Sequence, residues 1–308
     1  MKKILHVICI VLLSQLSIAW NGHDLLTYHL VKSALPELMN KYVRITEYQY
    51  NESRAYNLMK TVVGDWCEDL DGWVATWQIL KTYSCEPDMG MDEGLAISPL
   101  QFFPGVDSHV VRHAKIRIFN LDLFQGDESF YYFVRMSKIA FSRDDKYWGY
   151  RFLARALHYI EDLSQPYHNK IDTDDKVLQV LDANYRHFLR KCHYAYDLFL
   201  AYLFNINDRK LLDAIENTPP IPCKDEKELV KKVREFSISK FKTVHGEIKR
   251  LFEHILWKRK VKMEDFQIAD AKGQLEVLKE VTYQVISNFA GHTKYFLRKF
   301  MKEVRELN

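Results

Sequence analysis

The scarcity of glycine and proline is the feature that most restricts how this chain can fold. Only 11 glycines and 8 prolines interrupt 308 residues, which is about half the usual share of glycine. Sheet folds with many tight turns need more of both residues. Hydrophobic residues make up 47% of the chain and aromatic residues 14%, enough for a packed core with large rings between helices. We therefore expect an all-α fold without an evident domain boundary.

Residues 1–19 have the pattern of a cleaved secretory signal peptide. Two lysines precede an apolar stretch that is too short to span a membrane, and small residues end the segment at Ala19. We expect a secreted or periplasmic protein that begins at Trp20 and forms a single helical domain over residues 20–308. The formal charge is only +3, and loss of the two lysines would reduce it further. This gives no electrostatic case for a nucleic-acid partner.

Four cysteines follow the signal peptide. In an oxidising compartment an even number indicates two disulfides, and sequence proximity favours Cys67–Cys85 and Cys192–Cys223. The other two connectivities, and free buried thiols, stay open at this point. No paired C-x-x-C spacing is present, so a zinc site of four thiolates is not expected.

Hydrophobic periodicity predicts helices along most of the chain. Residues 65–110 hold several of the glycines and prolines, so we expect an irregular insertion closed by a disulfide. Residues 218–222 contain three prolines and mark a break. The predicted helices cover residues 22–40, 127–141, 145–163, 183–205, 225–257 and 271–305.

The segment from His158 to His168 reads H-Y-I-E-D-L-S-Q-P-Y-H. His158 and Asp162 are four residues apart, so on a helix both side chains leave the same face. Pro166 would end that helix and turn the chain back, which allows His168 to approach the same point. This pattern suits ligands of one metal ion, or a carboxylate that bridges two.

A second histidine–carboxylate pair, His193 and Asp197, has the same spacing on the next predicted helix. The pair falls on the apolar face, where an unpaired carboxylate would be costly. His187 instead lies beside Arg190 and Lys191, so we expect it in solvent. Two inward pairs on consecutive helices are typical of bundles that hold a multinuclear metal centre.

These segments together resemble the secreted zinc-dependent phospholipases C and the related single-strand nucleases of the S1/P1 type. H-Y-I-E-D-L-S-Q-P-Y-H is close to the family signature H-Y-x-x-D-x-x-Q-P-x-H. The mature chain would begin with tryptophan, as in that family, and Gly64–Leu70 looks like its G-x-x-x-E-D segment. The resemblance implies a compact multi-helix bundle of this type. The recognisable similarity covers residues 20–35, 64–70 and 136–205.

The resemblance also implies three zinc ions, with ligand types that suit zinc. The first set is Asp69, a histidine between residues 105 and 120, His158 and Asp162. The second set is His168, His193 and Asp197. The third set is the α-amine and carbonyl of Trp20, with His23 and a shared Asp162.

Three of these assignments have alternatives. His113 is our choice for the histidine between residues 105 and 120, although the family's usual H-F-x-D-P context is missing, and His109 is its alternative. His29 competes with His23, and Asp65 competes with Asp69. The remaining histidines are expected on the surface or in the core.

The implied activity is phospholipase C, with Asp69 and Asp162 as the catalytic carboxylates. Zinc-bound water would attack the phosphorus of a phospholipid such as phosphatidylcholine at a membrane surface, and aromatic rings could hold the choline group. The enzyme is expected to be a monomer. Two alternatives remain: an S1/P1-type single-strand nuclease, and a secreted binding protein that metal stabilises without turnover. The nuclease is less favoured because the chain lacks that branch's run of Asn and His before the last histidine–carboxylate pair.

Overall fold

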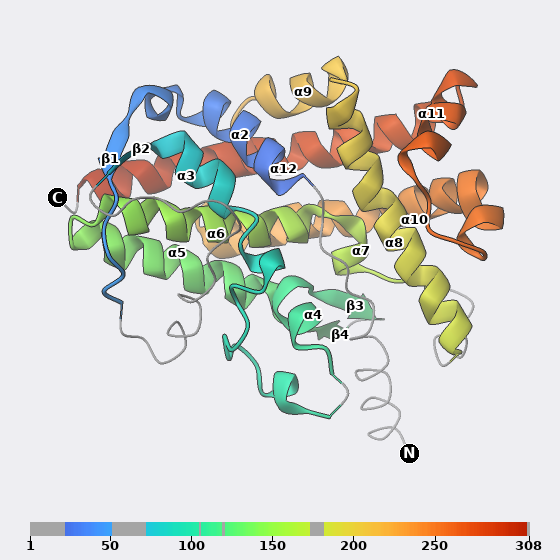
Figure 1. Ribbon diagram of the computed structural model, residues 1–308, viewed down its shortest axis with the longest axis horizontal. Helices are drawn as coiled ribbons and strands as arrows, with labels where there is room; N and C mark the ends of the chain where they lie inside the picture. The colour runs from blue at the N-terminus through green and yellow to red at the C-terminus, as the bar shows by residue number, and fades with distance from the viewer. Residues whose placement is uncertain (1–21, 51–71, 105, 119–120, 173–181, 307–308) are drawn as a thin grey trace.

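Two antiparallel helices, α5 (Gly126–Ser142) and α6 (Lys146–Ser164), run through the centre of the computed structural model (Figure 1). Helices dominate the part of the chain that the structure describes, so the all-α prediction is confirmed at the level of fold class. The described residues are 22–50, 72–104, 106–118, 121–172 and 182–306.

The sequence between the two central helices explains how they pair. Asp145 caps α6, since its side chain accepts the backbone N–H of Trp148 at 3.3 Å. Gly149 allows close approach, because a Cβ at this position would lie 2.8 Å from the ring of Phe141 on α5. All residues of α6 from Tyr147 to Ser164 except Arg151 are buried, although several are charged. A buried helix with charged groups needs partners for them.

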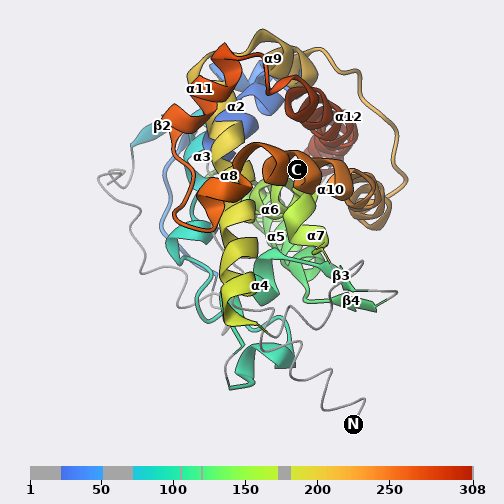
Figure 2. The same cartoon turned by 90° about the vertical axis from the view of Figure 1, so that its right-hand side faces the viewer.

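The other helices surround this central pair. Two long helices, one of 31 and one of 30 residues, lie along the central pair. Figure 2 shows the bundle viewed down its longest axis. The longest helices match the predicted ranges closely, whereas α3, α4, α9 and α11 lie in segments where we predicted no helix. The surrounding helices are α2 (His23–Ala34), α3 (Thr76–Tyr83), α4 (Ser108–His113), α7 (Pro166–Asn169), α8 (Ala183–Asn205), α9 (Arg209–Glu216), α10 (Glu226–Leu256), α11 (Met263–Ala271) and α12 (Glu276–Arg305).

Two short antiparallel hairpins complete the fold. β1 (Tyr42–Arg44) pairs with β2 (Trp73–Ala75), and β3 (Ile116–Ile118) pairs with β4 (Leu121–Leu123). The segment predicted as irregular also contains three-residue and four-residue 3₁₀ turns, η4 (Pro87–Met89) and η5 (Pro99–Phe102). A further 3₁₀ turn, η2 (Pro36–Asn40), follows α2. The described part of the insertion is thus built from short elements, of which α3 packs against α6 and α2, and η5 packs against α4.

The predicted disulfide between Cys192 and Cys223 is wrong, because both are free thiols. Cys192 lies on α8 near Lys249 and Glu253, whereas Cys223 lies near Lys232. These neighbours are on α10 and about 20 residues apart, which corresponds to about 30 Å along a helix. A disulfide needs Cα atoms within about 7 Å. Sequence proximity failed here because α9 carries the chain to the other end of α10.

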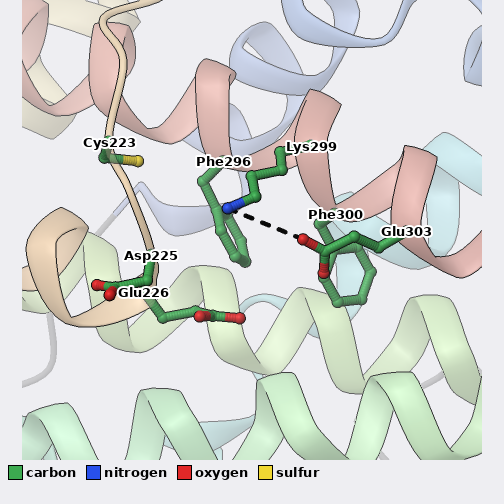
Figure 3. A pocket seen from close by; sticks show the side chains of 7 residues that line it. All are labelled: Cys223, Asp225, Glu226, Phe296, Lys299, Phe300 and Glu303. Carbon is green, nitrogen blue, oxygen red and sulfur yellow. Dashed lines mark ion pairs between the residues drawn. The ribbon is translucent and has the colours of Figure 1, made fainter.

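Cys223 borders a small pocket between the segment before α10 and helix α12 (Figure 3). Phe296 and Phe300 form its apolar wall. Nζ of Lys299 lies 4.0 Å from Oε1 of Glu303, one turn further along α12. Burial raises the pKa of the Cys223 thiol, as expected for an inert structural cysteine.

The predicted Cys67–Cys85 disulfide involves one residue outside the described part of the chain. Cys67 is not described, and Cys85 is a free thiol whose pKa burial raises to about 12. No disulfide is therefore present among the described residues.

No helix in the described part of the chain is long and apolar enough to cross a membrane. The predicted signal peptide, residues 1–19, and the predicted mature N-terminus at Trp20 lie outside the described residues.

Candidate metal centre

Helix α6 carries the first two predicted ligands on one face. His158 and Asp162 are both fully buried, and Nε2 of His158 lies 3.3 Å from Oδ2 of Asp162. Helix α6 ends just before α7, and this reversal returns the chain so that Nδ1 of His168 lies 3.5 Å from Oδ1 of Asp162. The chain reverses as predicted, and the side chains of His158 and His168 both approach Asp162.

Helix α4 supplies the next histidine. Nδ1 of His113 lies 2.7 Å from Oδ2 of Asp162 and 3.0 Å from Nε2 of His158. His109 stacks on the His113 ring, with centroids 3.9 Å apart, and its side chain is 26% exposed. The geometry therefore favours His113 as the inner ligand and leaves His109 at the edge that faces solvent.

The first turn of α2 brings in His23. Its Nε2 lies 3.6 Å from Oδ1 of Asp162, while Nδ1 of His29 lies 2.7 Å from a carboxylate oxygen of Glu216. His23 is buried and His29 is not. The geometry therefore favours His23 over its alternative.

Asp88, which lies in η4, is a member of the centre that the sequence motifs did not predict. Its Oδ1 is 3.7 Å from Nδ1 of His113 and 3.6 Å from Nε2 of His158, and its Oδ2 is 3.6 Å from Nε2 of His23. Asp88 thus stands where an aspartate was expected from Asp69. The signal that could have found it is the run Glu86-x-Asp88-x-x-x-Asp92, three closely spaced acids in an otherwise apolar region.

Asp69, its alternative Asp65, and Trp20 lie outside the described residues. Their predicted roles therefore remain predictions.

Outer hydrogen bonds fix the orientation of four imidazoles. Each donates one ring N–H to an acceptor that is not a predicted ligand atom, so the second ring nitrogen is the one that could bind a metal ion. Such outer partners are typical of histidines that bind metals. The four bonds are His23 Nδ1 to Glu161 at 2.6 Å, His113 Nε2 to Asp92 at 3.0 Å, His158 Nδ1 to the carbonyl of Ser84 at 2.8 Å, and His168 Nδ1 to the carbonyl of His113 at 3.2 Å.

Helix α8 places the second predicted pair beside this group. Nε2 of His193 lies 3.4 Å from Oδ2 of Asp197, and the His193 ring meets the His168 ring edge-on with centroids 4.8 Å apart. The side-chain amide of Gln165 donates to the other oxygen of Asp197 at 2.7 Å. His187 is exposed, as predicted from its position among basic residues.

Four donor atoms lie near one another at His113 and His158. They are Oδ1 of Asp88, Nδ1 of His113, Nε2 of His158 and Oδ2 of Asp162. Five of the six separations among them lie between 2.7 and 3.7 Å. Ligand bonds of 2.0–2.2 Å in a tetrahedron put ligand atoms about 3.3–3.6 Å apart, and two of the five separations, those of His158 to Asp162 and to Asp88, lie in this range. The donor types, imidazole nitrogen and carboxylate oxygen, suit zinc.

Several buried donor atoms lack a hydrogen bond within the described part of the chain. They are Oδ1 of Asp88, Oδ1 of Asp162, Nε2 of His168 and Oδ2 of Asp197. Buried polar atoms are almost always hydrogen-bonded, so a concentration of exceptions needs an explanation. Cations bound at these atoms would satisfy them.

Burial shifts the pKa of several members of the group. It lowers the pKa of His23 to about 3 and raises the pKa of Asp88 to about 6. Burial also raises the pKa of Asp197 well above its usual range. The pKa of His113 is raised to about 10, because the carboxylates of Asp92 and Asp162 outweigh the effect of burial. Protons and metal ions would therefore compete for these ligands.

Three sets of side chains bring ligand atoms within 4.8 Å of one another in the described part of the chain. They are His23, Asp88 and His158; Asp88, His109 and His113; and His113, His158 and Asp162. His168, His193 and Asp197 do not form such a set. The possible ligand atoms therefore lie closer together around Asp88, His113 and His158 than beside α8.

No family model matches the sequence, and neither the curated proteins nor the solved structures gave a match to this chain. Its function is therefore inferred from the geometry of the centre and from the motifs of the sequence.

Proposed function

We propose that this protein is a secreted zinc-dependent phosphodiester hydrolase, a phospholipase C that acts on phospholipids of the phosphatidylcholine type. The observation that carries the proposal is the buried cluster of donor atoms from Asp88, His113, His158 and Asp162. The sequence motif that resembles the zinc-dependent phospholipase C family contributes two of these four residues. The remaining motif residues, His168, His193 and Asp197, lie next to them.

The two oxygens of Asp162 face different groups, which suits a bridging carboxylate. Oδ2 is directed at His113 and His158, whereas Oδ1 lies 3.6 Å from Nε2 of His23. Asp162 would thus hold two ions in a fixed relation. When bound, zinc would supply positive charge for the phosphate oxygens and acidify a water molecule.

The residues at the edge of the group define where a substrate could approach. The side chains of Asp88 and His109 are 11% and 26% exposed, while those of His158 and Asp162 are fully buried. A phosphodiester that enters on this side meets Asp88 and His109 first. His23, His113 and His158 would remain shielded from water, so their orientation stays fixed during turnover.

The phospholipid proposal competes with two others. A single-strand nuclease would use the same ligands, but the charge of +3 gives little attraction for a polyanion. A binding protein that zinc only stabilises would need the same ligands and no substrate. The partial exposure of Asp88 and His109 favours an enzyme, because a purely structural zinc site is closed.

The test combines metal analysis with two substrates. The mature chain, beginning at Trp20, is loaded with zinc and its bound metal is measured. Phosphocholine release from phosphatidylcholine vesicles is then compared with cleavage of single-stranded DNA, each with and without a chelator. Zinc-dependent release of phosphocholine supports the proposal. Cleavage of DNA alone supports the nuclease, and bound zinc without turnover of either substrate supports the binding protein.

A further inference from the structure

The segment from Ser84 to Asp92 contributes to the centre at three points. The carbonyl of Ser84 accepts from His158, the carboxylate of Asp88 is a proposed ligand, and Asp92 accepts from Nε2 of His113. The arrangement of two ligating histidines and one ligating aspartate therefore depends on where this one segment lies. It contains only the three-residue turn η4, so its own backbone bonds cannot fix it.

Glu86 is the residue that fastens this segment to the bundle. Its side chain is fully buried, and Oε2 accepts from Nε of Arg155 at 2.7 Å. Arg151 also pairs with Glu86. Its Nη2 donates to Oε1 of Glu86, and its Nε donates to Oε2 of Glu86 at 3.4 Å. The backbone carbonyl of Glu86 accepts from the N–H groups of Met89, the last residue of η4, and of Met91, two residues later. One carboxylate thus joins the turn to two arginines of α6.

The two arginines lie on the same face of α6 as the ligands. Arg151, Arg155, His158 and Asp162 follow one another at spacings of four, three and four residues, which places them in a single stripe. The guanidinium of Arg151 is also held against the ring of Tyr83, 3.8 Å from its centroid. The helix that carries His158 and Asp162 therefore also sets the position of Asp88.

Stability alone does not explain a buried ion pair of this kind. A buried pair often contributes no more than well-packed apolar residues of the same volume, because both charges lose their hydration. What charged partners with fixed geometry can add is register between two elements. Here the register is that of the turn carrying Asp88 relative to His113 and His158.

We infer that Glu86 is a positioning residue for the metal centre: its contacts with Arg151 and Arg155 fix the Ser84–Asp92 segment so that Asp88 completes the set with His113 and His158. The inference rests on the proposed metal centre but not on the substrate. Outer partners of metal ligands typically change metal affinity by about 10- to 100-fold. We expect a loss of that size for the ion at Asp88 when Glu86 is changed.

The experiment measures zinc binding by the mature full-length chain. Glu86→Gln keeps the shape of the side chain and removes its charge. Zinc stoichiometry and affinity are measured by competition with a chromophoric chelator, and cobalt(II) absorption reports the coordination at the Asp88 set. The expected result is about 10- to 100-fold weaker binding of one ion, an altered cobalt spectrum, and unchanged affinity for the ions that do not use Asp88.

A second variant tests the same inference if Glu86→Gln does not fold. Arg151 is 14% exposed, so Arg151→Gln leaves the more buried pair of Glu86 and Arg155 in place and should fold, with a smaller loss of affinity in the same direction. Asp270→Asn is the matched control, because Asp270 binds Lys279 and Tyr202 on the α11 side of the molecule. It should lower thermal stability without changing zinc affinity.

The outcomes separate this inference from the proposed function. Folded Glu86→Gln and Arg151→Gln proteins that bind every zinc ion as the parent does would overturn the inference, even if the parent hydrolyses phosphatidylcholine. Selective loss of one ion in a parent that hydrolyses no phospholipid would support the inference and refute the lipid activity. A parent chain that binds no zinc would overturn both.

Discussion

At the residue scale, Asp162 is the side chain on which the centre depends most. It is fully buried, its two oxygens face different imidazoles, and the charges of His168 and His158 keep its pKa well below the usual range against the effect of burial. A carboxylate that stays ionised in such a place is suited to hold cations. A neutral side chain of the same shape, such as that of asparagine, has only one oxygen and could not bind cations on both sides.

We predict that Asp162→Asn lowers phosphodiester hydrolysis on the order of a thousandfold, because the change would remove the ligand that the two proposed ions share. Turnover on phosphatidylcholine and zinc content are measured on the same preparation. Near-normal turnover with a full complement of zinc would contradict a bridging role for this residue.

A second prediction decides between the aspartate found in the sequence and the one found in the structure. Asp88→Asn should weaken binding of one zinc ion by at least tenfold and reduce turnover, because Asp88 completes the set around His113 and His158. Asp69→Asn is the matched variant and should retain that ion. Zinc titration of both proteins checks the expectation. The reverse pattern would restore Asp69 as the ligand.

At the element scale, what could be predicted from the sequence was local. The pairs His158–Asp162 and His193–Asp197 lie within single helices, so their spacing alone places them on one face. Pro166 predicts the chain reversal before His168. Asp88 could not be found in this way, because it approaches His158 from a segment about 70 residues earlier in an irregular insertion.

The disulfide prediction failed for a related reason. Proximity in the sequence predicted a disulfide between Cys192 and Cys223, but an intervening helix separates them along α10. Helix phase is therefore a better guide in this chain than distance along the sequence.

Helix phase on α8 gives a third prediction. His193→Ala should lose one zinc ion and most of the activity, because His193 faces Asp197 and the ring of His168. His187→Ala should change neither, since His187 is exposed on the same helix six residues earlier. Metal content and phosphocholine release are measured for both. Equal zinc content in the two variants would refute the assignment by phase.

At the scale of the whole molecule, the centre joins parts of the chain that are far apart in sequence. Helices α2, α4, α6, α7 and α8 and the turn η4 each contribute at least one side chain, and α6 lies between them (Figure 1). Metal binding should therefore stabilise the fold as a unit. A ligand at a thousand times its Kd stabilises the folded state by about 4 kcal/mol when the unfolded chain does not bind it.

The pH dependence of this stabilisation is the last prediction. Without metal, Asp88 has a pKa of about 6 and His113 of about 10, so near pH 5 both hold a proton that zinc must displace. As pH rises from 5 to 7, Asp88 loses its proton and only His113 must still release one. Zinc affinity should therefore rise with pH, and zinc binding should release protons. In the metal-free protein, Asp88 changes the free energy of unfolding in the opposite direction. A carboxyl whose pKa is raised on folding contributes stability below its unfolded pKa of about 4 and loses that contribution as pH rises through 6.

The difference in melting temperature between zinc-loaded and chelated protein should accordingly widen from pH 5 to pH 7. Thermal unfolding at both pH values measures it, and Asp88→Asn should narrow the change. A difference that stays constant or shrinks over this range would show that Asp88 does not exchange a proton for the metal.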